Sequence, residues 1–365
     1  MNGQWERLGT SGRARRGRLQ TAHGLVETPA FMPVGTRASV RALDSGDLEE
    51  LGAQMMLANT YHLMLRPGAD LIARQGGLHG FTGWDRPTLT DSGGYQVFSL
   101  APAVSEDGVA FKSTYDGDRV FLSPEDAVGV QEKLGADIAM QLDVLVGLPA
   151  GRTEVEAAME RTLRWGERAR AAHTRADQAL FGIVQGGVDA ELRARSAAAT
   201  AALGFVGFGI GGLSVGETAA ERDRAIDAAV AELPDGKIRY VMGLGDTEGV
   251  LAAISRGCDL FDCVWPTRLA RHGKVFTESG DYSIKRAEYA DDDRPLEEGC
   301  DCHSCRRYSR AYLRHLKGTG ELSAQRLLSI HNLRYTMRLM EAVRAAIEAD
   351  ELEEFIAGRT ARRVP

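Results

Sequence analysis

Short apolar runs alternate with longer amphipathic segments along most of this 365-residue chain. Each run has the length of a buried strand, and each intervening segment has the periodicity of a helix with one apolar face. This alternation is typical of repeated β–α units that build a parallel sheet. Eight runs lie between residues 30 and 267: AFMPVGT, AQMMLANT, RPTLTDSGG, DIAMQLD, ALFGIVQGG, FVGFGIGG, IRYVMGLG and CDLFDCVWPT.

Eight strands that alternate with helices predict an α/β protein built on a (β/α)8 or TIM barrel. A doubly wound open sheet is the alternative, but no GxGxxG motif follows the first run. Three helix starts carry capping signals. Ser123 precedes Pro-Glu-Asp, while Thr153 and Thr218 each have a glutamate three residues later, which is the spacing of a capping box.

Chemically useful residues stand where the apolar runs end. The carboxyl ends of barrel strands meet at one mouth, where the active sites of such enzymes lie, so residues distant in sequence should converge there. A single aspartate after a strand is usually an ordinary turn residue, whereas several at corresponding ends favour a site. The residues at these ends are Asn59, Asp91, Asp143, Gln185, Gly211, Gly212, Gly243 and Asp262.

Charge and hydropathy narrow the possible partners. The net charge of −7 argues against a protein that coats nucleic acid without selectivity. Residues 264–340 nevertheless carry more Lys and Arg than Asp and Glu, which fits either selective contact with a phosphate backbone or a merely solvated face. No apolar stretch approaches the roughly 20 residues that span a bilayer, and no signal peptide is evident. We expect a cytoplasmic protein without membrane contact.

Three of the five cysteines crowd together near the C-terminus. Without a secretion signal, such crowding favours a metal site over disulfides. With one histidine, three thiolates complete the four-coordinate set of a closed, structural zinc site. His331 is the preferred histidine because it lies in a good helical pattern, and His303 and His315 are the alternatives. The predicted ligands of one Zn²⁺ are Cys300, Cys302, Cys305 and His331.

The chain is predicted to have three parts. Residues 1–29 would form β elements that cap the barrel, with a hairpin that turns at His23-Gly24. Residues 30–267 would form the catalytic barrel. Residues 268–365 would form the zinc-binding region and C-terminal helices, from about Ser323 to Ala357, that complete the barrel.

Several longer motifs resemble one enzyme family across nearly the whole chain. They are LTDSGGYQVFSL (89–100), GIVQGG (182–187), IGGLSVGE (210–217), MGLG (242–245), CDLFDCVWPTRLAR (258–271) and the CxCx2C…H cluster. In order and spacing they resemble the queuine tRNA-ribosyltransferases, also called tRNA-guanine transglycosylases. The resemblance implies a pentosyltransferase of queuosine biosynthesis that replaces guanine at the wobble position of tRNAs with GUN anticodons. It also implies a homodimer.

The resemblance assigns the chemistry to two carboxylates. Exchange of a base at a ribose with retention of configuration requires double displacement through a covalent sugar–enzyme intermediate. The family pattern places the nucleophile at Asp262 and the general acid/base at Asp91. The substrate-binding residues that it implies are Asp91, Ser92, Gly93, Gly94, Tyr95, Asp143, Gln185, Gly212, Leu213, Val215 and Met242.

Within that pocket, the resemblance implies specific contacts to the base. Asp143 would accept from the 2-amino and N1–H groups, and Gln185 and the Gly212 N–H would face the 6-carbonyl. Leu213 would add a backbone contact to a substituent at position 7. Tyr95 and Met242 would sandwich the ring. The implied RNA contacts are Gly243, Leu244, Gly245, Asp246, Thr247, Glu248 and Gly249, and Thr267, Arg268, Leu269, Ala270 and Arg271.

The incoming base is the least determined feature. Val144 and Leu145 replace a Glu-Cys pair common in bacterial members, whereas Val215 matches the bacterial type. We favour 7-aminomethyl-7-deazaguanine (preQ1), with queuine as the alternative. A non-catalytic accessory subunit and a simple zinc and RNA-binding module are further alternatives, but neither would need all three aspartates. The archaeal relative that modifies the D-loop is a second enzyme alternative. We expect it to be the weaker one, because that group carries long C-terminal RNA-binding extensions.

Overall fold

A computed structural model describes residues 3–100 and 102–363. Eight parallel strands form a closed barrel in the order β10-β11-β12-β13-β14-β4-β5-β6. Each predicted apolar run contributes one strand, so the barrel prediction is confirmed. The strands are β4 (Ala30–Gly35), β5 (Met56–Ala58), β6 (Thr88–Thr90), β10 (Ile138–Met140), β11 (Ala179–Val184), β12 (Gly207–Ile210), β13 (Ile238–Val241) and β14 (Leu260–Cys263).

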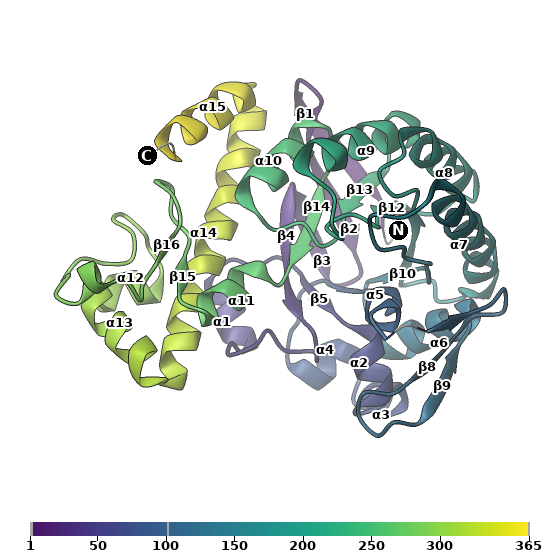
Figure 1. Ribbon diagram of the computed structural model, residues 1–365, viewed down its shortest axis with the longest axis horizontal. Helices are drawn as coiled ribbons and strands as arrows, with labels where there is room; N and C mark the ends of the chain where they lie inside the picture. Colours follow the sequence, from purple (N-terminus) through teal and green to yellow (C-terminus); the bar gives the residue numbers. More distant parts are fainter. Residues whose placement is uncertain (1–2, 101, 364–365) are drawn as a thin grey trace.

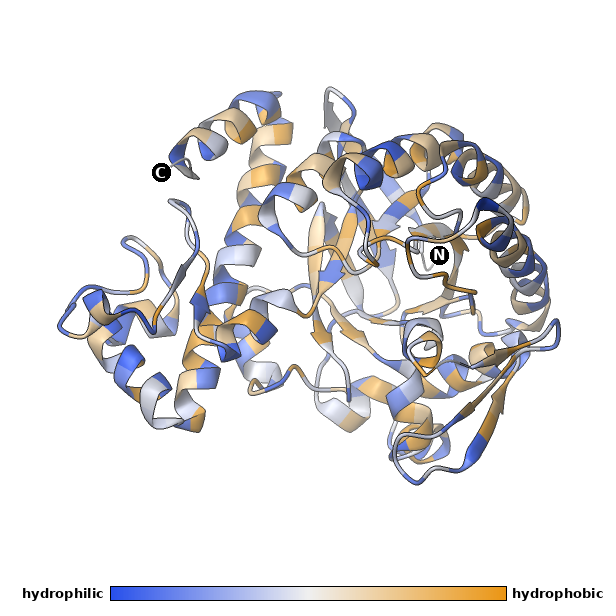
Figure 2. Cartoon of the chain, in the orientation of Figure 1, coloured by the Kyte–Doolittle hydropathy of each residue, from blue (hydrophilic) through white to orange (hydrophobic). Residues whose placement is uncertain are grey.

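Helices surround the barrel, and Figure 2 shows apolar residues on the strands but mixed faces on these helices. Burial of every residue in most barrel strands is expected, because the strands face side chains on one side and helices on the other. The helices up to the last strand are α1 (Ser45–Glu50), α2 (Thr60–Leu65), α3 (Ala69–Arg74), α4 (Gly77–Thr82), α5 (Gly94–Phe98), α6 (Pro124–Leu134), α7 (Arg152–Ala172), α8 (Ala190–Ala202), α9 (Ala219–Glu232) and α10 (Thr247–Ser255).

Two of the three predicted helix caps are present. The Ser123 and Thr218 side chains each accept from the backbone N–H three residues later, in complete capping boxes. The prediction for Thr153 is wrong, because α7 begins at Arg152 with Gly151 as its N-cap and no capping side chain. Thr153 therefore lies inside the first helical turn.

A small antiparallel sheet lies at the amino ends of the barrel strands. It contains β1 (Trp5–Ser11), β2 (Ala14–Thr21) and β3 (Gly24–Thr28), so a third strand joins the predicted hairpin. The hairpin is held to the barrel by Asp137, whose carboxylate accepts from the backbone N–H of His23 at 3.0 Å and from that of Thr88 at 2.8 Å. The open end of the barrel is therefore opposite this sheet.

A second sheet, which the sequence did not predict, is inserted between α5 and α6. It consists of β7 (Ala103–Val104), β8 (Val109–Lys112) and β9 (Arg119–Leu122), which pair in the order β7-β8-β9. Trp165 of α7 donates its indole N–H at 2.9 Å to the carbonyl of Glu106, which lies between β7 and β8. The insertion thus packs on the outer helices beside the mouth.

The C-terminal region stands beside the barrel, and the long helix α14 lies between the two (Figure 1). Its elements are α11 (Trp265–Arg271), β15 (Lys274–Val275), β16 (Tyr282–Ser283), a 3-10 turn (Ala287–Tyr289), α12 (His303–Arg307), α13 (Arg310–Thr319), α14 (Leu322–Glu348) and α15 (Leu352–Arg363). The division of the chain at residues 29 and 267 stays a prediction, and α11 spans the second of these positions. In the described residues, no helix is both long and apolar enough to cross a membrane.

Candidate active site

Asp262 lies on β14 and points its carboxylate at the neighbouring strand. The Tyr240 hydroxyl on β13 donates to Asp262 Oδ1 at 2.5 Å, and the Gly243 N–H donates to the same oxygen at 2.7 Å. Both of these bonds go to Oδ1, and Oδ2 accepts no hydrogen bond from the described residues. Oδ2 is therefore the oxygen that is available to react. Desolvation raises the pKa of Asp262, and the two donors oppose that shift.

Asp91 follows β6 and is held by three donors. Asn59 donates its amide to Oδ2, while the backbone N–H groups of Thr60 and Gly93 donate to Oδ1 at 3.0 and 3.2 Å. Desolvation, with a smaller effect from the negative charge of Asp262, raises the pKa of Asp91 to about 7. The two carboxylates therefore interact electrostatically, and one is poised to exchange a proton near neutral pH.

Asp143 forms the third part of the same mouth. Gln185 at the end of β11 donates its amide to Asp143 Oδ2 at 2.6 Å, and the Ser92 hydroxyl donates to Oδ1 at 3.2 Å. Burial raises the pKa of Asp143. Gly94 packs so closely that an added Cβ would lie 2.5 Å from Asp143 Oδ1. This close fit explains why a glycine stands there.

The loop after β12 closes the pocket on the side of Gln185. Gly212 has φ +65°, and a Cβ there would lie 2.2 Å from the Gln185 amide oxygen, so only glycine fits. The Val215 N–H donates to the Glu217 carboxylate at 3.0 Å. A Cβ on Gly216 would lie 2.8 Å from the Leu148 carbonyl oxygen, so this loop packs closely on the segment that contains Val144 and Leu145. Leu213 is buried.

Two predicted stacking residues differ in exposure. Tyr95 on α5 is 59% exposed, and its role in stacking stays a prediction. Met242 is half-buried after β13, and its sulfur lies 3.4 Å from the position that a Cβ on Gly211 would occupy. Ser92 and Gly93 directly follow Asp91, and the backbone turns there with Gly93 in the left-handed region.

The two predicted RNA segments flank the mouth. In the first, the Gly243 N–H donates to Asp262, and Gly245 packs on Cys263. Leu244 and Gly249 are buried. Asp246 caps α10, which begins with Thr247 and Glu248. In the second, Thr267 and Ala270 are buried, Leu269 is half-buried and Arg268 is exposed.

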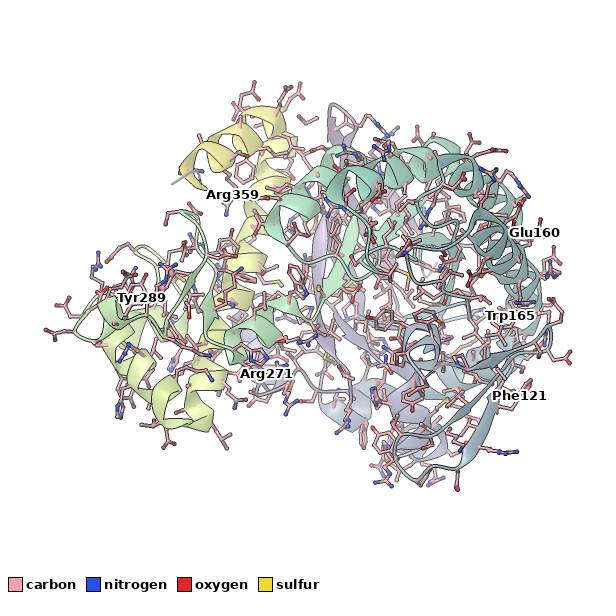
Figure 3. The ribbon with its side chains drawn as sticks, in the orientation of Figure 1. Phe121, Glu160, Trp165, Arg271, Tyr289 and Arg359 are labelled. Atoms are coloured by element: carbon pink, nitrogen blue, oxygen red, sulfur yellow. The ribbon has the colours of Figure 1, made fainter. Side chains whose placement is uncertain are left out.

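Arg271 lies between the barrel and the C-terminal helices (Figure 3). Burial, with the charges of Arg41 and Arg268, lowers the pKa of Arg271. Its buried Nη1 has no hydrogen-bond partner in the described residues. Three neighbouring guanidinium groups without an acidic partner there favour an anion at this position.

The predicted metal ligands converge. His331 Nδ1 lies 3.6, 3.8 and 3.3 Å from the sulfurs of Cys300, Cys302 and Cys305. A tetrahedral zinc ion with Zn–S and Zn–N bonds of about 2.3 and 2.0 Å would separate such ligand atoms by roughly 3.6 Å, so the geometry fits. The His331 Nε2–H donates to the Phe276 carbonyl at 2.8 Å, which leaves Nδ1 as the ligand atom. Neither His303 nor His315 belongs to the cluster.

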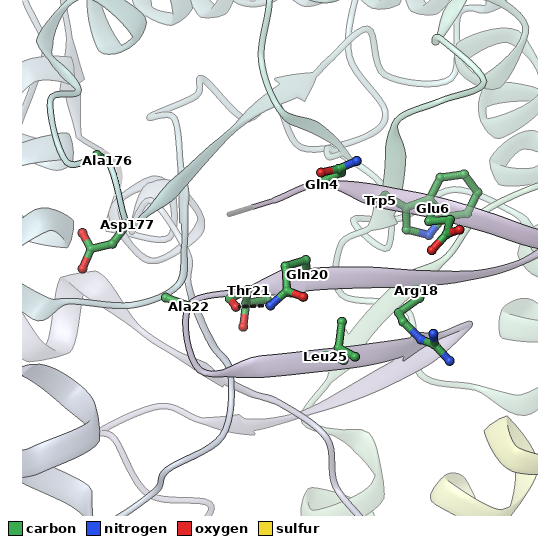
Figure 4. A pocket seen from close by; sticks show the side chains of 10 residues that line it. All are labelled: Gln4, Trp5, Glu6, Arg18, Gln20, Thr21, Ala22, Leu25, Ala176 and Asp177. Carbon is green, nitrogen blue, oxygen red and sulfur yellow. Dashed lines mark hydrogen bonds between the residues drawn. The ribbon is translucent and has the colours of Figure 1, made fainter. Parts of the chain in front are cut away.

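One surface cavity lies away from the mouth of the barrel. It is an open cavity on the N-terminal sheet, lined by polar residues such as Gln4, Glu6, Arg18 and Gln20 (Figure 4). None of its lining residues belongs to the mouth of the barrel, so it has no part in the candidate active site.

Two residues near the site were not predicted from the sequence. Tyr240, in the run IRYVMGLG, resembles an ordinary core aromatic, and only the barrel shows that its hydroxyl reaches Asp262. Arg193 lies in a helix whose pattern resembles a solvated surface, yet it is fully buried against the loop after β12. A buried arginine leaves no signal in a single sequence.

Comparison with known proteins agrees with the site. The family model described as Queuine tRNA-ribosyltransferase matches residues 10–365. The chain belongs to this family. It is 50% identical over 345 residues to the queuine tRNA-ribosyltransferase of Desulforamulus reducens. The aligned residues cover 94% of this chain and 93% of the relative.

Two further relatives show the same extent of similarity. The chain is 52% identical over 349 residues to the Herpetosiphon aurantiacus queuine tRNA-ribosyltransferase, covering 95% of this chain and 89% of the relative. With a Thermus thermophilus protein of the same name, it shares 50% identity over 361 residues, or 97% of this chain and 94% of the relative. The family resemblance inferred from the motifs is therefore confirmed.

Proposed function

We propose that this chain is a tRNA-guanine transglycosylase that inserts preQ1 in place of guanine at the wobble position. The observation that supports this most directly is the convergence of Asp91, Asp143 and Asp262 at one barrel mouth. Asp262 has one carboxylate oxygen held by two donors, and among the described residues the other accepts no hydrogen bond and is available to attack. Membership of the family supplies tRNA as the substrate class.

The reaction would proceed by two displacements at the anomeric carbon. Asp262 Oδ2 attacks that carbon, the C–N bond to guanine breaks, and Asp91 donates a proton to the departing base. The incoming base then loses its N9 proton to Asp91 and displaces the carboxylate, which regenerates Asp262. The Tyr240 hydroxyl and the Gly243 N–H orient the nucleophile and stabilise the carboxylate when it leaves.

Recognition of the base would use groups that are already aligned. Asp143 accepts from the 2-amino and N1–H groups of the purine, while Gln185 and the Gly212 N–H donate to the 6-carbonyl. Asp143 and Gln185 are bonded to each other, so each holds the other in place. Tyr95 and Met242 cover the two faces of the ring.

The tRNA backbone would bind beside the mouth. Arg268 and Arg271 lie at the end of α11, directly after the nucleophile strand, and Arg41 is close enough to affect the pKa of Arg271. Phosphate groups are the anions that such a cluster accepts. The homodimer stays a prediction of the family resemblance.

Zinc would have a structural role here. Cys300, Cys302, Cys305 and His331 fill four coordination positions, so no open position is left for a substrate. The ion would tie the loop before α12 to the middle of α14, and none of the steps above involves it.

The incoming base decides between the two forms of the proposal. We expect the purified protein to insert labelled preQ1 into a tRNA with guanine at the wobble position, and to use queuine poorly. Insertion of queuine alone would reverse the assignment of the base. Failure of both bases to enter a tRNA that the protein binds would contradict the transglycosylase itself.

Replacing Val215 by Gly should improve the use of queuine at least severalfold relative to preQ1. The half-buried Val215 lies in the loop that packs on Leu148, so removal of its side chain opens the wall on that side. The ratio of kcat/KM for the two bases measures the effect. The surface variant Asp235→Asn, distant from the mouth, serves as the control, and an unchanged ratio in Val215→Gly would contradict a role for this wall.

The pH dependence of the first step should follow Asp91. As the acid, Asp91 must carry its proton, and its pKa is about 7, so kcat/KM for tRNA should fall as the pH rises through that value. Above it, the loss should approach about tenfold per pH unit. Asp91→Asn should be slow and should lack this limb. A wild-type profile that stays flat between pH 6 and 9 would contradict the assignment.

A further inference from the structure

Arg193 is a cation buried beneath the base pocket, and the reaction described above does not use it. It lies near the start of α8, and its side chain is 0% exposed. Its guanidinium donates to four backbone carbonyls: those of Gly187, Val184 and Gly211 at 2.7, 3.0 and 2.7 Å, and that of Gly212 at 3.2 Å.

These carbonyls belong to the two loops that would bind the base. Val184 and Gly187 flank Gln185 at the end of β11, and Gly211 and Gly212 follow β12. One planar guanidinium therefore joins both loops. Because its donors are fixed in a fork, the relative position of the loops is fixed as well.

The carbonyl directions determine where the amides point. In a trans peptide the C=O and the following N–H point in opposite directions. Since the carbonyls of Gly211 and Gly212 point at Arg193, the N–H groups of Gly212 and Leu213 point away from it. The structure records no acceptor for either N–H within residues 3–100 and 102–363.

Charge acts in the same direction as geometry. Burial lowers the pKa of Arg193 to about 9, which leaves it protonated at neutral pH. Glu217 binds the N–H groups of Ser214 and Val215 further along the loop, and no carboxylate touches the guanidinium among the described residues. The positive charge therefore lies behind the two peptides, where it increases the donor strength of their N–H groups.

We infer that Arg193 is a positioning residue that aims the Gly212 and Leu213 amides at the 6-carbonyl side of the purine. The negative charge that forms on the base as the C–N bond breaks is delocalised onto the 6-oxygen. Donors that are aligned in advance stabilise such charge without reorganisation. This inference rests on the proposed transglycosylase function.

A comparison of two bases separates this role from a purely structural one. Guanine has a 6-oxygen and an N1–H, and 2-aminopurine lacks both. Asp143, which would accept from N1–H, is the same in every variant, so a change in base preference between proteins reports on the 6-oxygen. Both bases can be tested as competitors of labelled guanine exchange into tRNA. The wild-type protein should prefer guanine strongly. In Arg193→Lys, which keeps the charge but cannot reach four carbonyls, the preference should fall at least tenfold, mainly through weaker guanine binding. Arg195→Lys, on the exposed face of the same helix, should leave the preference unchanged.

Each outcome bears on the inference. An unchanged guanine preference in folded Arg193→Lys would overturn it, although the transglycosylase function would stand because the exchange reaction still occurs. If Arg193→Lys does not fold, Arg193→Gln replaces it in the same assay. Failure of both to fold would assign Arg193 to stability alone and reject the inference. No guanine exchange by the wild-type protein would instead contradict the proposed function.

Discussion

Replacement of Asp262 by Asn should abolish base exchange, with a loss of about three orders of magnitude or more. An amide can accept the hydrogen bonds from Tyr240 and Gly243, so the geometry of the mouth should survive, but it cannot form the ester with the ribose. Wild-type protein stopped by denaturation during turnover should carry covalently bound RNA, and the variant should carry none. Gel electrophoresis under denaturing conditions measures that adduct.

The controls for this variant are direct. Asp235→Asn removes an exposed carboxylate outside the mouth and should retain both the adduct and the exchange. The melting temperature of Asp262→Asn should not be lower than that of the wild type, because the Asp262 carboxylate is desolvated and its pKa is raised. An adduct that persists in Asp262→Asn would move the nucleophile elsewhere, with Asp91 as the nearest alternative carboxylate.

Replacement of Cys302 by Ser should release the metal and unfold the region around α12 and α14. Structural zinc contributes about 10–16 kcal/mol of binding free energy in small zinc-finger peptides, which is comparable with the whole stability of a domain. Zinc content should fall from one ion per chain to a trace. Hydrogen exchange should accelerate in residues 300–331, and a strong chelator should produce the same change in the wild-type protein.

Other residues near the cluster serve as matched controls. Cys258→Ala removes a buried cysteine that lies outside it, and His315→Ala removes one of the two histidines that are alternatives to His331 in the sequence. Both should keep one zinc ion per chain. Loss of zinc from His315→Ala with retention in His331→Ala would reverse the ligand assignment.

The barrel and the convergence of the site were predictable because strand ends have a fixed meaning in this fold. Once eight runs are assigned as parallel strands, Asp91, Asp143 and Asp262 must meet at one mouth, however far apart they lie in the sequence. The metal cluster was predictable for a different reason, because three cysteines so close together in sequence favour a metal site.

What escaped prediction depends on side-chain direction and on local competition. Tyr240 and Arg193 are ordinary residues in their own segments, and their partners lie on other strands. Thr153 has capping spacing, but the helix extends one residue before it and Gly151 is the N-cap. The strands β7, β8 and β9 are short and partly exposed, so the hydrophobic pattern of their sequence cannot be distinguished from that of a loop.

The contact between the N-terminal sheet and α14 has a consequence for folding during synthesis. Arg16 on β2 bonds Glu348 at 2.7 Å, and Arg344 donates to the carbonyl of Pro29 at 2.9 Å, just before the first barrel strand. These partners are more than 300 residues apart in the chain. The first strands made on the ribosome must therefore wait for almost the last helix before their outer surface is covered, and until then they present an exposed surface on which chaperones can act.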